Sequence, residues 1–340
     1  MEPRKLNRIA SRFALALLGT LVALILAECI VRRLDLAPQF APLEISTGHG
    51  DFTWVDDPVL KYLPRPGAPG VNNLGFRDRD RSVEKTPYTL RVVTLGDSIA
   101  YGYCTPEFSH PREKVFTRIA EEMLNLNSPK RYEVLNLAVS GYDIEQEVRL
   151  LETHGLELHP DVVVVAYCLN DDVRGASIEL KQFSSNGAEL WGRQVLRRLL
   201  THSYLFRWVA AMLASVNSHD VVRVQDFEMR RKSFQALKSF ASAGKFQIIV
   251  LIFPNLSSRS VGTNQLTQVV QADAESFGFD VVDLLPVFLE AGAGRLETIR
   301  GRCSEMHPDE GGHRLVAEQL ANKIKDIHGG SYRLGGGSAR

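Results

Sequence analysis

From residue 90 onward, five short apolar and mostly β-branched runs alternate with segments of helix-forming composition. The run Val162-Val163-Val164-Val165 is uniformly apolar, which is typical of a central strand covered on both faces. Alternating strands and helices predict an α/β fold, a three-layer α/β/α sandwich around a five-stranded parallel sheet with right-handed crossovers. The expected strands are 90–95, 132–137, 162–167, 246–253 and 279–284, and the expected helices lie near 113–126, 143–157, 226–243, 262–276 and 311–326.

A serine stands just after the first of these strands, in Gly96-Asp97-Ser98. A parallel strand that breaks into a Gly-containing turn presents its next side chains at the carboxyl edge of the sheet, where open α/β folds bind ligands. Ser98 is therefore a candidate nucleophile. The alternative is an ordinary strand-to-helix turn in which Asp97 or Ser98 caps the helix that follows.

Three further segments follow in a fixed order along the chain. The second apolar run ends in Asn136-Leu137-Ala138-Val139-Ser140-Gly141, the third ends in Cys168-Leu169-Asn170-Asp171, and His307-Pro308 lies near the C-terminus. This ordered set resembles the SGNH (GDSL) family of esterases, lipases and acyltransferases, and the resemblance covers about residues 90–327. The four family blocks fall on Ser98, Gly141, Asn170 and His307.

The resemblance implies a flavodoxin-like SGNH hydrolase fold and an acyl-enzyme mechanism. In that mechanism Ser98 attacks an ester carbonyl and His307 accepts its proton. The family pattern implies an oxyanion hole made by the backbone N–H groups of Ser98 and Gly141 and by the side-chain amide of Asn170. Asp97 and Asp171 are expected to support the site, with no cofactor and no metal.

Two positions depart from the family pattern. Cys168 replaces the glycine that opens the third block, and Ser304 replaces the aspartate three residues before the histidine. Glu305 and Asp283 are candidates for the missing triad acid, and Asp309 is also close in sequence. A serine and histidine dyad without a carboxylate would work more slowly, because an orienting carboxylate is worth up to about ten-thousandfold.

The resemblance implies a serine esterase that cleaves short acyl groups from a small molecule, a lipid or a glycan. One alternative is an O-acyltransferase that acts on envelope or exported glycans with the same residues. Another is a non-catalytic binding or scaffold protein on the same fold. Forty basic and forty acidic residues leave no net charge, so nothing favours a nucleic-acid partner.

An apolar segment near the N-terminus, residues 13–31, predicts a transmembrane signal anchor. A helix over these residues would be about 28 Å long, enough to span a hydrocarbon core of about 30 Å if Glu28 reaches the interface. Four basic residues precede it within residues 1–12, so this end is expected in the cytoplasm and the hydrolase domain in the periplasm or outside the cell. A cleaved signal peptide is the alternative.

The rest of the chain is divided by composition. We expect a stalk over 36–89, the hydrolase domain over 90–327 and a flexible tail over 328–340. A helical insertion is expected over 172–225, because this interval is too long for a simple crossover. Within it, 191–212 reads as an Arg-bearing helix, which would form a lid, a face resting on anionic lipid, or a peripheral helix packed on the sheet.

The four cysteines show no paired Cys-x-x-Cys spacing of a zinc site. Under the family resemblance, Cys104, Cys168 and Cys303 each lie within a few residues of a catalytic block. A Cys104–Cys303 disulfide would suit an oxidising compartment. Three small buried thiols are the alternative.

Overall fold

The computed structural model describes residues 3–34, 52–68, 70–102, 112–169, 171–172, 199, 203–206, 208–209, 212, 226–256, 263–301 and 307–329. The chain forms two compact units. The first unit comprises residues 1–50 and 176–222, and the second comprises residues 51–175 and 223–340. The second unit contains the parallel sheet, and the first contains the apolar N-terminal segment.

The second unit is built on a five-stranded parallel sheet in the order β4-β3-β5-β6-β7. Every strand expected from the sequence is present and begins and ends within one residue of its expected bounds. The strands are β3 (Thr89–Gly96), β4 (Arg131–Asn136), β5 (Val162–Cys168), β6 (Gln247–Phe253) and β7 (Asp280–Asp283).

The middle of the sheet is the most buried part of the core. Strand β5 pairs with β3 through Val92↔Val162 and with β6 through Val163↔Ile248, and all seven of its residues are buried. Such a strand has no polar face because helices cover both of its sides. The uniform valine run therefore predicted its place correctly.

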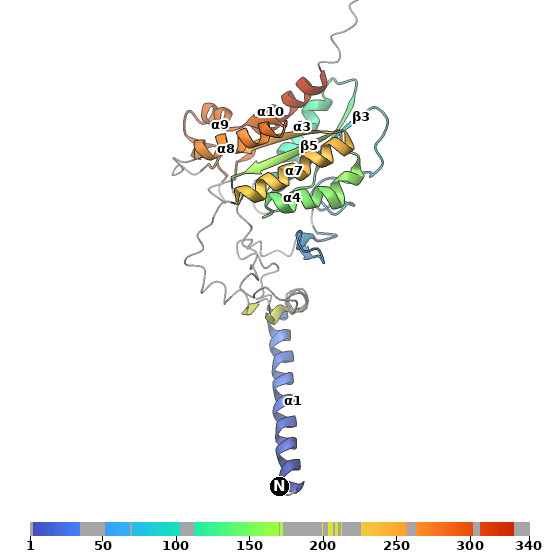
Figure 1. Ribbon diagram of the computed structural model, residues 1–340, viewed down its shortest axis with the longest axis vertical. Helices are drawn as coiled ribbons and strands as arrows, with labels where there is room; N and C mark the ends of the chain where they lie inside the picture. The colour runs from blue at the N-terminus through green and yellow to red at the C-terminus, as the bar shows by residue number, and fades with distance from the viewer. Residues whose placement is uncertain are drawn as a thin grey trace, which may run out of the picture. The chain divides into compact units, whose positions relative to one another are not determined.

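Helices flank the sheet on both faces (Figure 1). One group holds α3 (Phe116–Asn125) against α10 (Glu310–Gly329), and another holds α4 (Ile144–Leu150) against α7 (Phe227–Gly244). The remaining helices are α2 (Ser98–Tyr101), α8 (Thr263–Ser276) and α9 (Leu285–Ala291), with short 3-10 turns at Arg112–Lys114 and Leu296–Thr298. The fold is thus the expected three-layer α/β/α sandwich.

The helix expected over 143–157 is shorter than its composition predicts. Helix α4 ends at Leu150 and continues as a π-helical turn over Leu151–Gly155 and a 3-10 turn over Leu156–Leu158. His159 ends this segment in the left-handed conformation, with φ of 52°. The widened turn keeps Leu151 and Leu158 buried, so packing rather than propensity sets the local geometry here.

Residues 51–89, which fall within the expected stalk, belong to the second unit. Strands β1 (Phe52–Trp54) and β2 (Tyr62–Pro64) form an antiparallel ribbon, and the Tyr62 hydroxyl donates to the carbonyl of Ser140 at 2.9 Å. The Pro-, Gly- and Asp-rich sequence around Arg77 favours a surface position, but Arg77 is buried and its guanidinium donates to the carbonyl of Tyr101 at 2.6 Å. This segment therefore packs against the loops that follow the strands.

The first unit contains α1 (Pro3–Arg33). Among the described residues, Arg12–Arg33 is long and apolar enough to cross a membrane, with a mean hydropathy of 2.5. Its apolar side chains are mostly exposed, unlike those of a core helix in a water-soluble domain. An N-terminal signal sequence has the same character, so both sequence interpretations remain.

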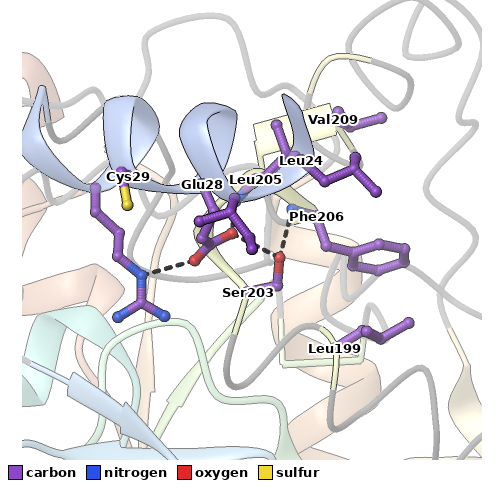
Figure 2. Close-up of a pocket in the computed structure, with 10 residues that line it drawn as sticks. Leu24, Glu28, Cys29, Leu199, Ser203, Leu205, Phe206 and Val209 are labelled. Atoms are coloured by element: carbon purple, nitrogen blue, oxygen red, sulfur yellow. Dashed lines mark hydrogen bonds and ion pairs between the residues drawn. The ribbon is translucent and has the colours of Figure 1, made fainter. Parts of the chain in front are cut away.

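Glu28 of α1 is bound by another segment of the first unit rather than turned toward solvent, as Figure 2 shows. Its carboxylate accepts hydrogen bonds from the Ser203 hydroxyl at 2.8 Å and from the backbone N–H groups of Tyr204 and Leu205, each at 2.9 Å. Arg32 adds an ion pair at 2.7 Å. This contact holds part of the expected 172–225 insertion on the helix.

A cavity of about 660 Å³ lies beside this contact. Its lining is mostly apolar and comes from the last turns of α1 and from the described residues between 199 and 209, including Leu24, Ile25, Leu205 and Phe206. The expected 191–212 helix otherwise lies largely outside the described residues. The described part is attached to α1, which is consistent with an amphipathic segment that rests at the end of the apolar helix.

Candidate active site

The turn after β3 places Ser98 at the first position of a short helix. Gly96 has φ of 157°, and a Cβ at this position would lie 2.6 Å from the Cβ of Ala100 and 3.0 Å from that of Ala166. Only glycine fits so close an approach. Asp97 then caps α2, because its Oδ1 accepts the N–H of Ile99 at 2.9 Å. Asp97 therefore has the capping role expected from the sequence, and the half-buried Ser98 that follows it still has the position of a candidate nucleophile.

His307 faces Ser98 across this turn. Its Nε2 lies 2.7 Å from the Ser98 Oγ, a hydrogen bond between residues 209 positions apart in the chain. The backbone around His307 is held by the bridge between Arg300 and Pro308 and by the N–H of Gly301, which donates to the His307 carbonyl at 2.8 Å. The structure thus brings together the two residues that the sequence proposed as nucleophile and base.

The environment of His307 favours its neutral form. Burial lowers the pKa of His307 below its usual 6.5, and the negative charge of Asp97 opposes that shift without cancelling it. A neutral imidazole can accept the Ser98 proton near pH 7, whereas an imidazolium cannot.

The third sequence block packs against the nucleophile turn. The Cys168 thiol donates to Asp97 Oδ1 at 3.2 Å, and the Cys168 N–H donates to Asp171 Oδ2 at 2.7 Å. Cys168 is a free, buried thiol, so the residue that replaces glycine here fills space beside Asp97. Asn170 lies outside the described residues, between Leu169 and Asp171 in this turn.

The second block runs alongside the first. Beyond the end of β4 the chain keeps pairing with β3, because Leu137 donates its N–H to the Thr94 carbonyl at 2.9 Å and Val139 donates to the Gly96 carbonyl at 3.0 Å. Two residues later Gly141 has φ of 82°, a left-handed conformation that favours glycine. This path leads the Gly141 loop toward the turn that bears Ser98.

Of the candidate triad acids, Asp283 and Asp309 lie among the described residues and Glu305 does not. Glu305, and Ser304 in the family's acid position, lie outside the described residues. Asp283 accepts the N–H of Leu285 at 2.9 Å, at the start of α9. Asp309 accepts the N–H of Gly312 at 2.8 Å, at the start of α10. The proposed Cys104–Cys303 disulfide also lies outside the described residues.

His313 lies within the helix expected over 311–326, a position that favours packing over chemistry. It is fully buried and its ring stacks on that of Phe116, with centroids 6.0 Å apart and planes 10° apart. The two histidines of this region therefore have separate roles, one facing Ser98 and one in the core.

Sequence analysis missed a buried acid, Glu147, on α4. Helical spacing could have revealed it, because Ile144, Glu147 and Leu151 are three and four residues apart and share one face of the helix. All three are buried completely. A carboxylate on the apolar face of a helix is unusual and indicates a special environment.

Asp97, Cys168 and Asp171 are the described residues best placed to hold a cation. Their ligand atoms all lie within 4.8 Å of one another, and all three side chains are buried. Two of the carboxylate oxygens already accept backbone N–H groups, from Ile99 and Cys168. A cation here would have to share those oxygens.

Comparison with family models agrees with the motifs. The model of the GDSL-like lipase/acylhydrolase family matches residues 94–315. A search of the curated proteins finds no match. Solved structures with similar folds include a catalytic mutant of Axe2, an acetylxylan esterase from Geobacillus stearothermophilus, at 14% identity, covering 69% of this chain and 94% of that chain with a TM-score of 0.44. A lipase/acylhydrolase from Enterococcus faecalis matches at 14% identity, covering 70% of this chain and 96% of that chain with a TM-score of 0.44.

Proposed function

This chain belongs to the GDSL-like lipase/acylhydrolase family, and from that premise we propose that it is a serine esterase in which Ser98 is the nucleophile and His307 the base. Hydrolysis of acyl esters is the activity of the family. The single observation that supports the two residue roles is the 2.7 Å hydrogen bond between His307 Nε2 and Ser98 Oγ. A nucleophile and a base within hydrogen-bond reach are the first requirement of acyl transfer.

In the proposed reaction, Ser98 Oγ attacks the ester carbonyl while its proton passes to His307 Nε2. The tetrahedral intermediate collapses as His307 returns that proton to the leaving alcohol, and an acyl-enzyme remains. Water then attacks the acyl-enzyme with His307 again accepting a proton. The lowered pKa of His307 keeps it in the form that this cycle requires.

The oxyanion would be bound by the backbone N–H groups of Ser98 and Gly141 and by the amide of Asn170. The position of Ser98 at the first residue of α2 supports its part, because the first N–H groups of a helix have no partner within the helix. The left-handed Gly141 supports a close approach of backbone to substrate. Loss of one such donor costs about a hundredfold in rate.

We place the esterase on the outer side of a membrane, held by α1. The apolar Arg12–Arg33 supports a membrane anchor. The basic residues of the first twelve positions support a cytoplasmic N-terminus. The proposed substrates are short acyl esters of a lipid, a glycan or a small molecule at the cell envelope.

Hydrolysis of a short-chain nitrophenyl ester by the full chain in detergent tests this proposal, beside Ser98→Ala and His307→Ala variants. We expect each substitution to lower kcat/KM by roughly a thousandfold or more. His313→Ala is not a suitable control, because it would open a hole in the core, whereas His159→Ala changes a histidine outside the site. Equal rates in all of these proteins would contradict the proposal and favour a binding protein or a transferase that requires its own donor.

A further inference from the structure

Behind Ser98 lies a group of acids that the proposed reaction does not use. Asp97 comes from the turn after β3, Asp171 from the turn after β5, and Glu147 from α4. Each side chain is buried, with exposures of 2%, 0% and 0% respectively. Cys168 lies among them and donates its thiol hydrogen to Asp97 Oδ1. The charge of Asp97 acts on both Glu147 and Asp171, so buried carboxyl groups from three elements interact electrostatically.

The hydrogen bonds of this group are incomplete. Asp97 Oδ1 and Asp171 Oδ2 each accept a backbone N–H, from Ile99 and Cys168. Within the part of the chain that the structure describes, both oxygens of Glu147 and the Oδ1 of Asp171 have no hydrogen-bond partner. A buried polar atom without a partner is destabilising, and a buried charge without one is more so.

The charged groups that act on Glu147 and Asp171 are nearly all negative. Asp97, in the turn after β3, acts on both acids. Asp143, at the start of α4, acts on Glu147, and Glu147 acts on Asp171. From the turn after β5, Asp172 adds a further carboxylate. On α7, which packs against α4, Arg230 pairs with Asp172 and Asp273, and His307 faces Ser98 with its pKa lowered toward the neutral form.

We propose that Glu147 is a positioning residue of the esterase site. Its side chain holds a proton in the working enzyme, and in this uncharged form it keeps the turns that bear Ser98 and Asn170 packed on α4. The role in the site rests on the proposed esterase function. The link between the elements is visible in the backbone, since the N–H of Ile144 at the start of α4 donates to the Asp171 carbonyl at 3.3 Å.

The direction of the pKa shifts agrees with this assignment. Burial, followed by the charges of Asp97 and Asp143, raises the pKa of Glu147 well above its usual 4.5. Burial and the charges of Glu147 and Asp97 likewise raise the pKa of Asp171, and the Cys168 N–H opposes that rise. Ionisation of Glu147 would add a negative charge that interacts unfavourably with Asp97 and Asp171, at oxygens for which the described residues provide no hydrogen-bond partner, and the two turns would move apart.

The test uses Glu147→Gln, which keeps the shape and polarity of the side chain but cannot ionise. Glu145→Gln is the matched control, because Glu145 lies two residues away on the exposed side of α4. Thermal unfolding of the full chain in detergent is followed from pH 5 to pH 9 for both variants and the wild type. This readout requires no esterase activity.

The expected sign follows from proton linkage. A group whose pKa is raised on folding stabilises the fold fully below its unfolded value near 4.5, and that stabilisation is lost as the pH rises toward the folded pKa. The Tm of the wild type should therefore fall relative to that of Glu147→Gln as the pH rises, by roughly 3 °C or more, with no such change for Glu145→Gln. Parallel pH dependences of wild type and Glu147→Gln would overturn the proposal.

A second arm measures kcat/KM against pH. We expect the wild type and Glu145→Gln to lose activity reversibly at alkaline pH, up to about tenfold per pH unit, and Glu147→Gln to lack this decline. If all three proteins are inactive, the esterase proposal fails while the melting arm still tests the protonated acid. An alkaline decline that persists in Glu147→Gln overturns the positioning role.

Two further measurements keep the test decisive if Glu147→Gln does not fold. Infrared titration of the wild type should show a protonated carboxyl band at pH 7 that disappears at alkaline pH, and its absence would overturn the proposal. Elemental analysis of the purified wild type should find less than one divalent metal ion per chain. A stoichiometric ion that is bound by this group would overturn it too, because the ion would then balance the charge in place of the proton.

Discussion

Asp171 and Asp172 are adjacent in the chain and both buried, yet their surroundings are opposite. Asp172 forms an ion pair with Arg230 and accepts the hydroxyl of Tyr167, and Arg230 also binds Asp273 at 2.5 Å. The carboxylate of Asp171 accepts only the N–H of Cys168 among the described donors, and the charges that act most strongly on it are those of Glu147 and Asp97. One carboxylate is balanced by a guanidinium, and the other lies among carboxylates.

The difference shows two ways to keep acids inside a protein. Burial raises the pKa of Asp172, but the Tyr167 hydroxyl and Arg230 oppose that rise, so its charge has partners. At Asp171 the neighbouring acids raise the pKa further instead. The first arrangement joins the ends of the insertion, where the N–H of Asp226 donates to the Asp172 carbonyl at 2.7 Å. The second lies behind Ser98, where a proton rather than a cation can set the charge.

The most disruptive way to break the comparison is to remove the cation from the Asp172 side. We expect Arg230→Leu to lower the free energy of unfolding by about 3 kcal/mol or more, because it leaves the buried carboxylate of Asp172 without its cation. Arg231→Leu is the control, since Arg231 pairs with the same Asp273 but is 57% exposed, and should change it by less than about 1 kcal/mol. Thermal melting of both variants measures the two losses of stability. Equal decreases in Tm would contradict the view that the buried charge of Arg230 balances Asp172.

A subtler change compares the two acids directly. Asp172→Asn should cost about 2 kcal/mol, because it weakens the hydrogen bonds to Arg230 and Tyr167. Asp171→Asn should cost less than about 1 kcal/mol, because an amide oxygen still accepts the Cys168 N–H while a like charge is removed. Chemical unfolding of the two variants at pH 7 gives the difference. A greater loss for Asp171→Asn would reverse our interpretation of the two clusters.

His307 extends the comparison to a buried base, because its pKa is shifted mainly by burial and less by the charge of Asp97. The proposed mechanism requires neutral His307, so kcat/KM should rise with pH and reach half its plateau below pH 6.5. Below that midpoint the rate should fall about tenfold per pH unit. A pH profile in buffers of constant ionic strength measures the midpoint, and a value clearly above 6.5 would mean that a carboxylate dominates the environment of His307.

The smallest effect is expected at the surface. Lys114 and Glu310 form an ion pair at 2.5 Å between the 3-10 turn before α3 and the start of α10, and both side chains are well exposed. Lys114→Met should change the free energy of unfolding by less than about 1 kcal/mol. The melting temperature at low and high salt measures it. A loss of stability as large as that of Arg230→Leu would mean that burial does not determine how much an ion pair contributes to stability.

Much of the fold could be predicted because its signals are local. The five strands are short runs rich in apolar and β-branched residues, and the residues of each run identify it without reference to the others. The departures are where tertiary packing decides: α4 widens into a π-helical turn at Leu151, and Arg77 is buried through a contact with the carbonyl of Tyr101. The sequence near Leu151 or Arg77 does not show which distant groups each residue will pack against.

Part of the candidate site could also be predicted from local signals in the sequence. Ser98 and His307 belong to short motifs with a fixed order, and the structure brings them to 2.7 Å. Glu147 belongs to no such motif, and its environment depends on Asp97 and Asp171 from two other elements. A single sequence does not show which acids will meet in the core.

Covalent labelling of the nucleophile tests the central claim most directly. The full chain is treated with a fluorophosphonate, digested, and the modified peptide is sequenced by mass spectrometry, with His307→Ala treated in parallel. We predict one phosphonyl group on Ser98 and labelling that is slower by at least about a hundredfold in His307→Ala. An unlabelled protein, or a label on another serine, would contradict the assignment of Ser98 as the nucleophile.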